Sequence, residues 1–221
     1  MSRKSERSPD IKTRSDYAYA LYILETRYAQ ENFWTFCQVM YPEFYKDDRL
    51  YLKDLCDTLQ DFYEGKIDKK ILIINMPPRH GKTFTARLFV LWLFGKDNRT
   101  KIITGSYNQI LSSLFAQQTR DGIMAENING RDKYFSDIFP HVKIKQGDAA
   151  KGFWSLEESE EKNYLATSPG GTSTGIGANY VLVDDIIKNS EEANNENNKM
   201  KHWEWYNNTL VQRMERPVSR S

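Results

Sequence analysis

Apolar and polar residues alternate along the chain in patterns that predict both helices and strands. Over residues 16–41 and again over 50–63, apolar side chains return every third or fourth position, which predicts an N-terminal helical segment. Short, mostly apolar runs at 71–75, 101–104 and 180–183 are instead typical of strands that a parallel sheet buries on both faces. The order of these elements predicts an α/β fold, in which a mainly parallel central sheet is flanked by helices and preceded by the helical segment.

The rest of the chain carries weaker patterns. Residues 109–123 are predicted to form a helix, and residues 153–156 and 164–166 a hairpin around a charged loop. The polar stretch 127–148 is expected only to connect elements, because glycine and proline punctuate it. Residues 203–214 are predicted to form a largely apolar helix that packs on the core.

One loop has the composition of a phosphate-binding loop. The apolar run at 71–75 leads into Gly81-Lys82-Thr83, where a helix is expected to begin, and the N–H groups of a helix N-terminus favour an anion. This is the order of a P-loop, although Met76 replaces the first glycine of G-x-x-x-x-G-K-[ST] and Pro77-Pro78 adds no N–H donors. A plain turn between strand and helix is the alternative. We predict that a triphosphate is bound by Arg79, His80, Gly81, Lys82 and Thr83.

A pair of carboxylates follows the apolar run at 180–183. Asp184 and Asp185 come directly after it, as expected of a Walker-B strand. The carboxyl ends of parallel strands open onto one crevice, so these side chains are expected to meet the phosphate loop. The alternative is that the aspartates cap the segment that follows. We predict that Asp184 and the Thr83 hydroxyl hold Mg²⁺ and that Asp185 polarises the attacking water.

Four segments together resemble one protein family. They are Asn75-Met76-Pro77-Pro78-Arg79-His80-Gly81-Lys82-Thr83, Thr104-Gly105-Ser106-Tyr107-Asn108, Gly170-Gly171-Thr172-Ser173-Thr174-Gly175-Ile176-Gly177-Ala178, and Asp184-Asp185. Over about residues 30–215 the chain is similar to the large terminase subunit of tailed bacteriophages, an ATP-driven motor that packages DNA into a prohead. The missing first glycine makes the loop much more specific to these terminases than a generic phosphate loop.

The resemblance implies a P-loop ATPase domain that couples ATP hydrolysis to translocation of double-stranded DNA into a prohead, with ATP and Mg²⁺ as cofactors. Lys82 is then expected to bind the β- and γ-phosphates, and Arg79 to stabilise the γ-phosphate in the transition state, unless Arg79 is an ordinary surface arginine. The implied partners are double-stranded DNA, the phage portal and prohead, and the small terminase subunit. The full-length protein is expected to form a homo-oligomeric ring in the host bacterial cytoplasm.

The chain departs from the family pattern in two places. Ile176 stands where many terminases carry an arginine between the last two glycines of the loop, which puts an arginine finger there in doubt. A coupling strand and a nuclease domain are also expected to be absent, so nuclease activity is not expected from this chain alone. The expected organisation is a tail at 1–15, a helical segment at 16–65, an ATPase core at 66–215 that is incomplete at its C-terminus, and a tail at 216–221.

Two other classes of function stay open at this point. One is a truncated nucleotide-binding module without turnover, because Asp185 is one methylene shorter than the glutamate that many such ATPases use. The other is a DNA-dependent ATPase unrelated to packaging, such as a helicase, built on the same core.

Composition limits the kinds of binding partner that are expected, but it does not identify one. The net charge of +1 gives no global basic field, so any contact with DNA must come from a local patch. A secretory signal and a long apolar run are both missing, so no membrane is expected as a partner. Cys37 and Cys56 are too few and too oddly placed for a disulfide scaffold or a zinc site, and we expect them to be reduced core residues.

Two groups of residues have both a structural and a functional interpretation. Ser106 and Asn108 either cap the next helix or belong to the site. The segment before the phosphate loop helps to close over adenine in terminases, so the aromatic residues there are either core or a base platform. These residues are Tyr41, Phe44, Tyr45 and Tyr51.

Overall fold

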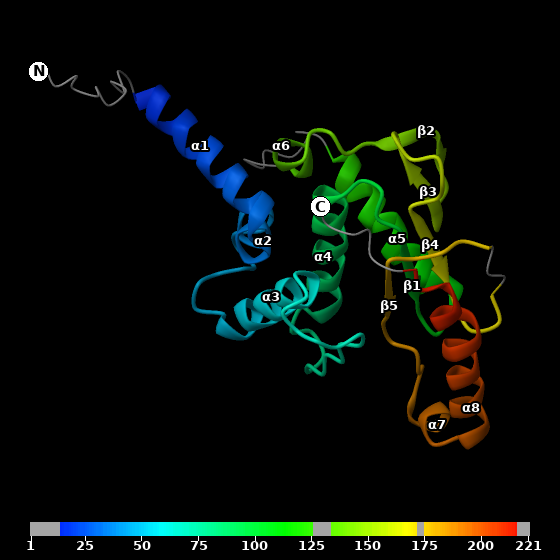
Figure 1. Cartoon of the computed structure of the whole chain (residues 1–221). Coiled ribbons are helices and arrows are strands. Elements are labelled where there is room, and N and C mark those ends of the chain that lie inside the picture. The colour runs from blue at the N-terminus through cyan, green and yellow to red at the C-terminus, as the bar shows by residue number, and fades with distance from the viewer. Residues whose placement is uncertain (1–13, 126–133, 172–174, 216–221) are drawn as a thin grey trace, which may run out of the picture.

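Helices build the N-terminal part of the computed structural model, which describes residues 14–125, 134–171 and 175–215. They are α1 (Arg14–Glu31), α2 (Phe33–Met40) and α3 (Leu50–Tyr63), and they match the helical segment predicted from the sequence. Asn32 separates the first two, because its side chain accepts a hydrogen bond from the backbone N–H of Thr35 and so caps α2. Figure 1 shows α1 extending away from the sheet, with α2 and α3 beside α4.

A five-stranded sheet forms the second part of the fold, in the order β2-β3-β4-β1-β5. Its strands are β1 (Ile102–Gly105), β2 (Ile144–Ala149), β3 (Phe153–Leu156), β4 (Tyr164–Thr167) and β5 (Tyr180–Val183). β1 is parallel to β4 and β5, whereas β3 is antiparallel to β2 and β4. The chain is therefore an α/β protein, and the predicted hairpin is confirmed.

The sheet is mixed, so the prediction of a mainly parallel sheet is wrong. The reason lies in the short connections on either side of β3, because a tight loop can join only antiparallel neighbours. The polar stretch expected to be a mere connection contains α6 (Phe135–Ile138) and β2, while residues 126–133 lie outside the described chain. The side chains of β2 are exposed or half-buried. The sequence of β2 therefore lacks the apolar run by which the other strands were predicted.

The run at 71–75 is not a strand in this structure, contrary to the sequence prediction. Its side chains nevertheless alternate: Leu72 and Ile74 pack against the main core, whereas Ile71 and Ile73 are 59% and 87% exposed. A β-strand exists only when a neighbour completes its hydrogen-bond ladder. β5 is the edge of the described sheet on the side away from β4, and it pairs with β1 alone. The segment thus has the composition of a strand, but no neighbouring strand in the described chain pairs with it.

Helix α4 (Lys82–Lys96) lies at the centre of the main core. Residues 88–94 are all buried, because α4 packs against α1, α2 and α5. The indole Nε1 of Trp92 donates to the carbonyl of Ala29 at 3.2 Å, and the ring of Phe94 lies 5.4 Å from that of Trp154 on β3. A helix that is apolar all round must be buried, and here it joins the two halves of the fold.

The two cysteines belong to this core. Cys37 and Cys56 are free and buried, with their sulfur atoms 3.9 Å apart. Burial raises the pKa of the Cys37 thiol well above its ordinary value, which keeps the thiol protonated and unreactive at neutral pH. The expectation of reduced core cysteines is confirmed.

The opposite face of the sheet carries a smaller core. Successive residues of β1 point to opposite faces, so Ile102 contributes to the main core and Ile103 to the smaller one. The chain after β5 covers this second face with Trp205 and Leu210, as was predicted for the apolar helix, although Trp203 remains 61% exposed. This covering part consists of α7 (Ser190–Ala193), α8 (Glu196–Trp205), a π-helical turn (Tyr206–Leu210) and a 3₁₀ turn (Val211–Arg213).

Candidate functional site

The structure brings the end of the phosphate loop into contact with the carboxylates that follow β5. The Thr83 hydroxyl donates a hydrogen bond of 2.5 Å to Oδ2 of Asp184, although 101 positions separate the two residues in the chain. Nζ of Lys82 lies 3.0 Å from Oδ1 of Asp184 and 3.6 Å from Oδ1 of Asp185. Four of the residues predicted from the sequence therefore form one cluster.

The fold explains why these residues meet. α4 begins at Lys82, so Lys82 and Thr83 occupy its first turn, where the helix dipole favours negative charge. β5 ends at Val183, which is level with Gly105 of β1, and the N–H of Asp184 donates to the carbonyl of Gly105 at 2.9 Å. The N–H of Tyr107 in turn donates to the carbonyl of Asp185 at 3.1 Å. The backbone around both carboxylates is thus tied to the chain that follows β1.

Backbone strain is concentrated in the same place. Among the described residues, Arg79 and Asp185 are the non-glycine residues with positive φ, at 63° and 48°. Such conformations cost on the order of 1 kcal/mol and persist where the surroundings hold them, often at functional sites. Gly81 has a φ of 89°, and a Cβ there would meet the ring of Phe44 at 2.8 Å. Glycine is therefore required at position 81 by both backbone conformation and space.

The electrostatics of the cluster favour a cation bound between acidic groups. Burial alone would lower the pKa of Lys82, but the carboxylates of Asp184 and Asp185 outweigh it and raise the pKa above its ordinary value. Lys82 is therefore fully charged at neutral pH. One lysine faces two carboxylates, so the cluster carries an excess negative charge that a further cation would neutralise.

The oxygen atoms present suit Mg²⁺ held together with a phosphate. The described residues contain no cluster of three or more histidine, cysteine, aspartate or glutamate side chains able to hold a metal by themselves. Mg²⁺ in nucleotide sites needs less, because it keeps several waters and is bound by one or two protein oxygens plus substrate phosphates. Thr83 Oγ1 and the Asp184 carboxylate are such a pair of adjacent oxygens.

Arg79 and His80 lie apart from this cluster, although both were predicted to belong to the site. Their side chains are exposed, and Nδ1 of His80 lies 2.9 Å from the carbonyl of Pro78. The structure shows no contact, within the described chain, between either side chain and the two carboxylates. Both residues nevertheless belong to the loop that leads directly to Lys82.

The aromatic residues before the loop are mostly structural. Tyr45 is 1% exposed, and its hydroxyl shares a hydrogen bond of 2.9 Å with that of Thr85 on α4. The rings of Tyr41, Phe44 and Tyr45 all pack against Phe84. Tyr51 differs from them, because it is 44% exposed and lies 5.9 Å from the ring of His80. Of the four predicted aromatic residues, Tyr51 keeps a free face beside the phosphate loop.

Asn108 acts as a helix cap. Its side-chain oxygen accepts from the N–H of Leu111 at the start of α5 (Gln109–Met124), which is the helix predicted there. Ser106 is buried, and its N–H donates to the carbonyl of Thr167. These contacts confirm the capping interpretation for Asn108 and give Ser106 a structural place between β1 and β4.

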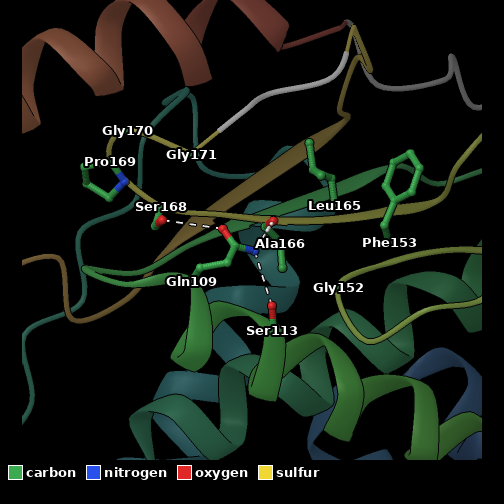
Figure 2. A pocket seen from close by; sticks show the side chains of 10 residues that line it. All are labelled: Gln109, Ser113, Gly152, Phe153, Leu165, Ala166, Ser168, Pro169, Gly170 and Gly171. Carbon is green, nitrogen blue, oxygen red and sulfur yellow. Dashed lines mark hydrogen bonds between the residues drawn. The ribbon is translucent and has the colours of Figure 1, made fainter.

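Sequence reasoning did not identify a cavity of about 550 Å³ at the carboxyl end of β4. Gln109 links two other residues that line this cavity, because its Nε2 donates to the carbonyl of Ala166 at 3.0 Å and to Oγ of Ser113 at 3.2 Å (Figure 2). Gly170 and Gly171 border the cavity, and a Cβ on Gly171 would come within 3.3 Å of Oγ1 of Thr167. The sequence signal near this cavity was the glycine-rich segment that begins at Gly170.

The glycine-rich loop is described only at its two ends, because residues 172–174 lie outside the described chain. At its far end the carbonyl of Ile176 accepts a hydrogen bond of 3.2 Å from Nη1 of Arg213. Ile176 itself is half-buried. The side chain at this position therefore supplies no cation, and the guanidinium that contacts the loop comes from the 3₁₀ turn at the end of the described chain.

Comparison with known proteins does not assign the chain to a family. No protein-family model matches the chain, and a search of curated proteins found no match. None of the helices in the described ranges combines the length and the apolar character that crossing a bilayer requires.

Proposed function

We propose that this chain is a P-loop ATPase domain that binds ATP with Mg²⁺ between the first turn of α4 and the end of β5. The observation that carries the proposal is the joint contact of Thr83 and Lys82 with Asp184. The first turn of α4, which follows a glycine, supplies a hydroxyl and an ammonium, and the residue after β5 supplies a carboxylate. Phosphoryl transfer uses these three kinds of group.

The four residues have separate tasks in the proposed reaction. Lys82 exchanges its ion pairs with Asp184 and Asp185 for the β- and γ-phosphates, which leaves both carboxylates able to act. Thr83 and Asp184 would hold Mg²⁺, which would supply positive charge that neutralises the phosphates. Asp185, which is 67% exposed on its side chain, orients the attacking water.

Arg79 is the proposed source of further positive charge. Its backbone is held at positive φ three residues before Lys82, and its side chain is exposed to solvent. A guanidinium binds phosphate oxygens through two parallel hydrogen bonds, so it can follow the charge that develops in the transition state.

The biological role that fits these residues is DNA packaging. Together with the resemblance of the four sequence segments to phage terminases, the proposed ATPase site supports a role as the motor domain of a terminase large subunit. Its partners would be double-stranded DNA, the portal and prohead, and the small terminase subunit, and its setting the host bacterial cytoplasm.

Release of phosphate from ATP by the purified chain tests the proposed reaction. With Mg²⁺ we expect slow hydrolysis above the background without protein, and loss of this activity when EDTA removes the metal. Linear double-stranded DNA should raise the rate if the motor assignment is right, with single-stranded DNA of the same length as the control. No Mg²⁺-dependent hydrolysis under any of these conditions, combined with normal folding, would rule out the ATPase.

Binding without turnover is the second candidate function. The observation in its favour is the exposure of Asp185, because a carboxylate surrounded by solvent polarises water less effectively than one in a closed site. Tight Mg²⁺-dependent binding of ATP with no phosphate release would identify this alternative.

A further inference from the structure

Helix α1 is apolar on two opposite faces. One face, which includes Thr26 and Ala29, is buried against the rest of the chain, and Ala29 accepts the hydrogen bond from Trp92. The other face carries a stripe of four large apolar side chains that are exposed to solvent. These are Tyr17 at 55%, Leu21 at 41%, Leu24 at 63% and Tyr28 at 63% exposure.

The spacing of this apolar stripe is that of a helix pair. The intervals along Tyr17, Leu21, Leu24 and Tyr28 are four, three and four residues, which is the alternation of a and d positions in a heptad. Side chains at this spacing form a single narrow seam along an α-helix and pack against another helix rather than against a flat surface. Figure 1 shows α1 projecting from the body of the chain, so a second helix has room to approach.

The order of residues in the stripe is self-complementary in the antiparallel direction. When two copies of α1 run in opposite directions about a two-fold axis between positions 22 and 23, Tyr17 of each copy faces Tyr28 of the other. Leu21 and Leu24 face each other in the same way. A self-complementary patch of this kind is what an isologous two-fold interface requires.

Charged residues of the same helix are compatible with the antiparallel arrangement. Beside the stripe, Glu25 and Arg27 would face Ala18 and Ala20, so like charges are kept apart.

We propose that the apolar stripe of α1 binds the same stripe of a second copy of this chain, forming an antiparallel, two-fold symmetric dimer. α1 has 18 residues and is therefore about 27 Å long, which allows little more than two heptads of contact. Such a seam is short for a coiled coil, so we expect dissociation in the micromolar range rather than a permanent dimer. The proposal does not depend on the ATPase assignment.

Sedimentation velocity of the full chain over a range of concentrations tests the dimer. The unmodified chain should shift from monomer to dimer as its concentration rises, and Leu24→Glu should raise the dissociation constant by at least about tenfold. Leu21→Ser provides a second, milder disruption. Tyr19→Glu is the matched control, because Tyr19 is 67% exposed on the same helix but outside the stripe, and it should leave dimerisation unchanged.

Cysteine cross-linking tests the orientation. A mixture of the Tyr17→Cys and Tyr28→Cys chains should form a disulfide between the two different chains under mild oxidation, whereas neither chain alone should do so. The two native cysteines are buried and give little background. A monomer at all concentrations, or a dimer that Leu24→Glu does not weaken, would overturn the proposal. A disulfide between two identical Tyr17→Cys chains would show a parallel pair and overturn the orientation.

Discussion

Lys82→Ala is expected to lower the rate of ATP hydrolysis by at least about 100-fold, because it removes the charge that meets the β- and γ-phosphates. Lys82 is the ammonium that faces both carboxylates in the described chain, at 3.0 Å from Asp184 and 3.6 Å from Asp185. Without it, Mg²⁺ alone would offset the repulsion between the triphosphate and the two carboxylates. Affinity for ATP should fall as well, since the lysine contacts the phosphates in the ground state.

Steady-state phosphate release and nucleotide binding measure the two effects of Lys82→Ala separately. Lys53→Ala is a suitable control, because Lys53 forms an exposed ion pair with Asp57 on α3, away from the cluster. Such surface pairs contribute little to stability, so the control should fold and hydrolyse ATP normally. Normal turnover by folded Lys82→Ala would mean that the loop before α4 is only a turn between two elements.

Asp185→Asn is expected to leave Mg²⁺-dependent ATP binding nearly unchanged and to lower hydrolysis by about 100-fold or more. An amide keeps the size of the side chain but cannot take or orient a proton as a carboxylate does. The φ of 48° at Asp185 is tolerated by asparagine, which is enriched in the left-handed region, so the backbone should hold its conformation.

A single-turnover experiment with saturating ATP separates the effect of Asp185→Asn on chemistry from effects on binding. Normal hydrolysis by this variant would assign the water to another group. Equal losses of binding and turnover would instead place Asp185 among the residues that hold the metal or the phosphates.

The sequence predicted that the two motifs would meet, although one premise of that prediction was wrong. β5 is parallel to β1, so the carboxyl ends of these two strands lie at one edge of the sheet as expected. The run at 71–75 is not a strand of this sheet, yet the loop that follows it still brings Thr83 to Asp184. Helices α3 and α5 were predicted because apolar side chains at helical spacing define one buried face.

Other parts of the fold depend on partners that local patterns do not specify. Ile71 and Ile73 are strand-forming residues, but whether they form a strand depends on a neighbouring strand, and β5 remains the sheet edge in the described chain. β2 is held by pairing with β3 and has no apolar run of its own. The positive φ of Arg79 and Asp185 could not be predicted, because it is uncommon for any non-glycine residue, even though aspartate adopts it more often than arginine does.

The central claim is that Thr83 and Asp184 hold Mg²⁺ together with a triphosphate, and calorimetric titration with a non-hydrolysable ATP analogue tests it most directly. The unmodified chain should bind the analogue more tightly with Mg²⁺ than with EDTA, because the ion joins the phosphates to the two protein oxygens. Asp184→Asn should remove most of this difference while the protein stays folded. Binding that is unaffected both by EDTA and by Asp184→Asn would contradict the account.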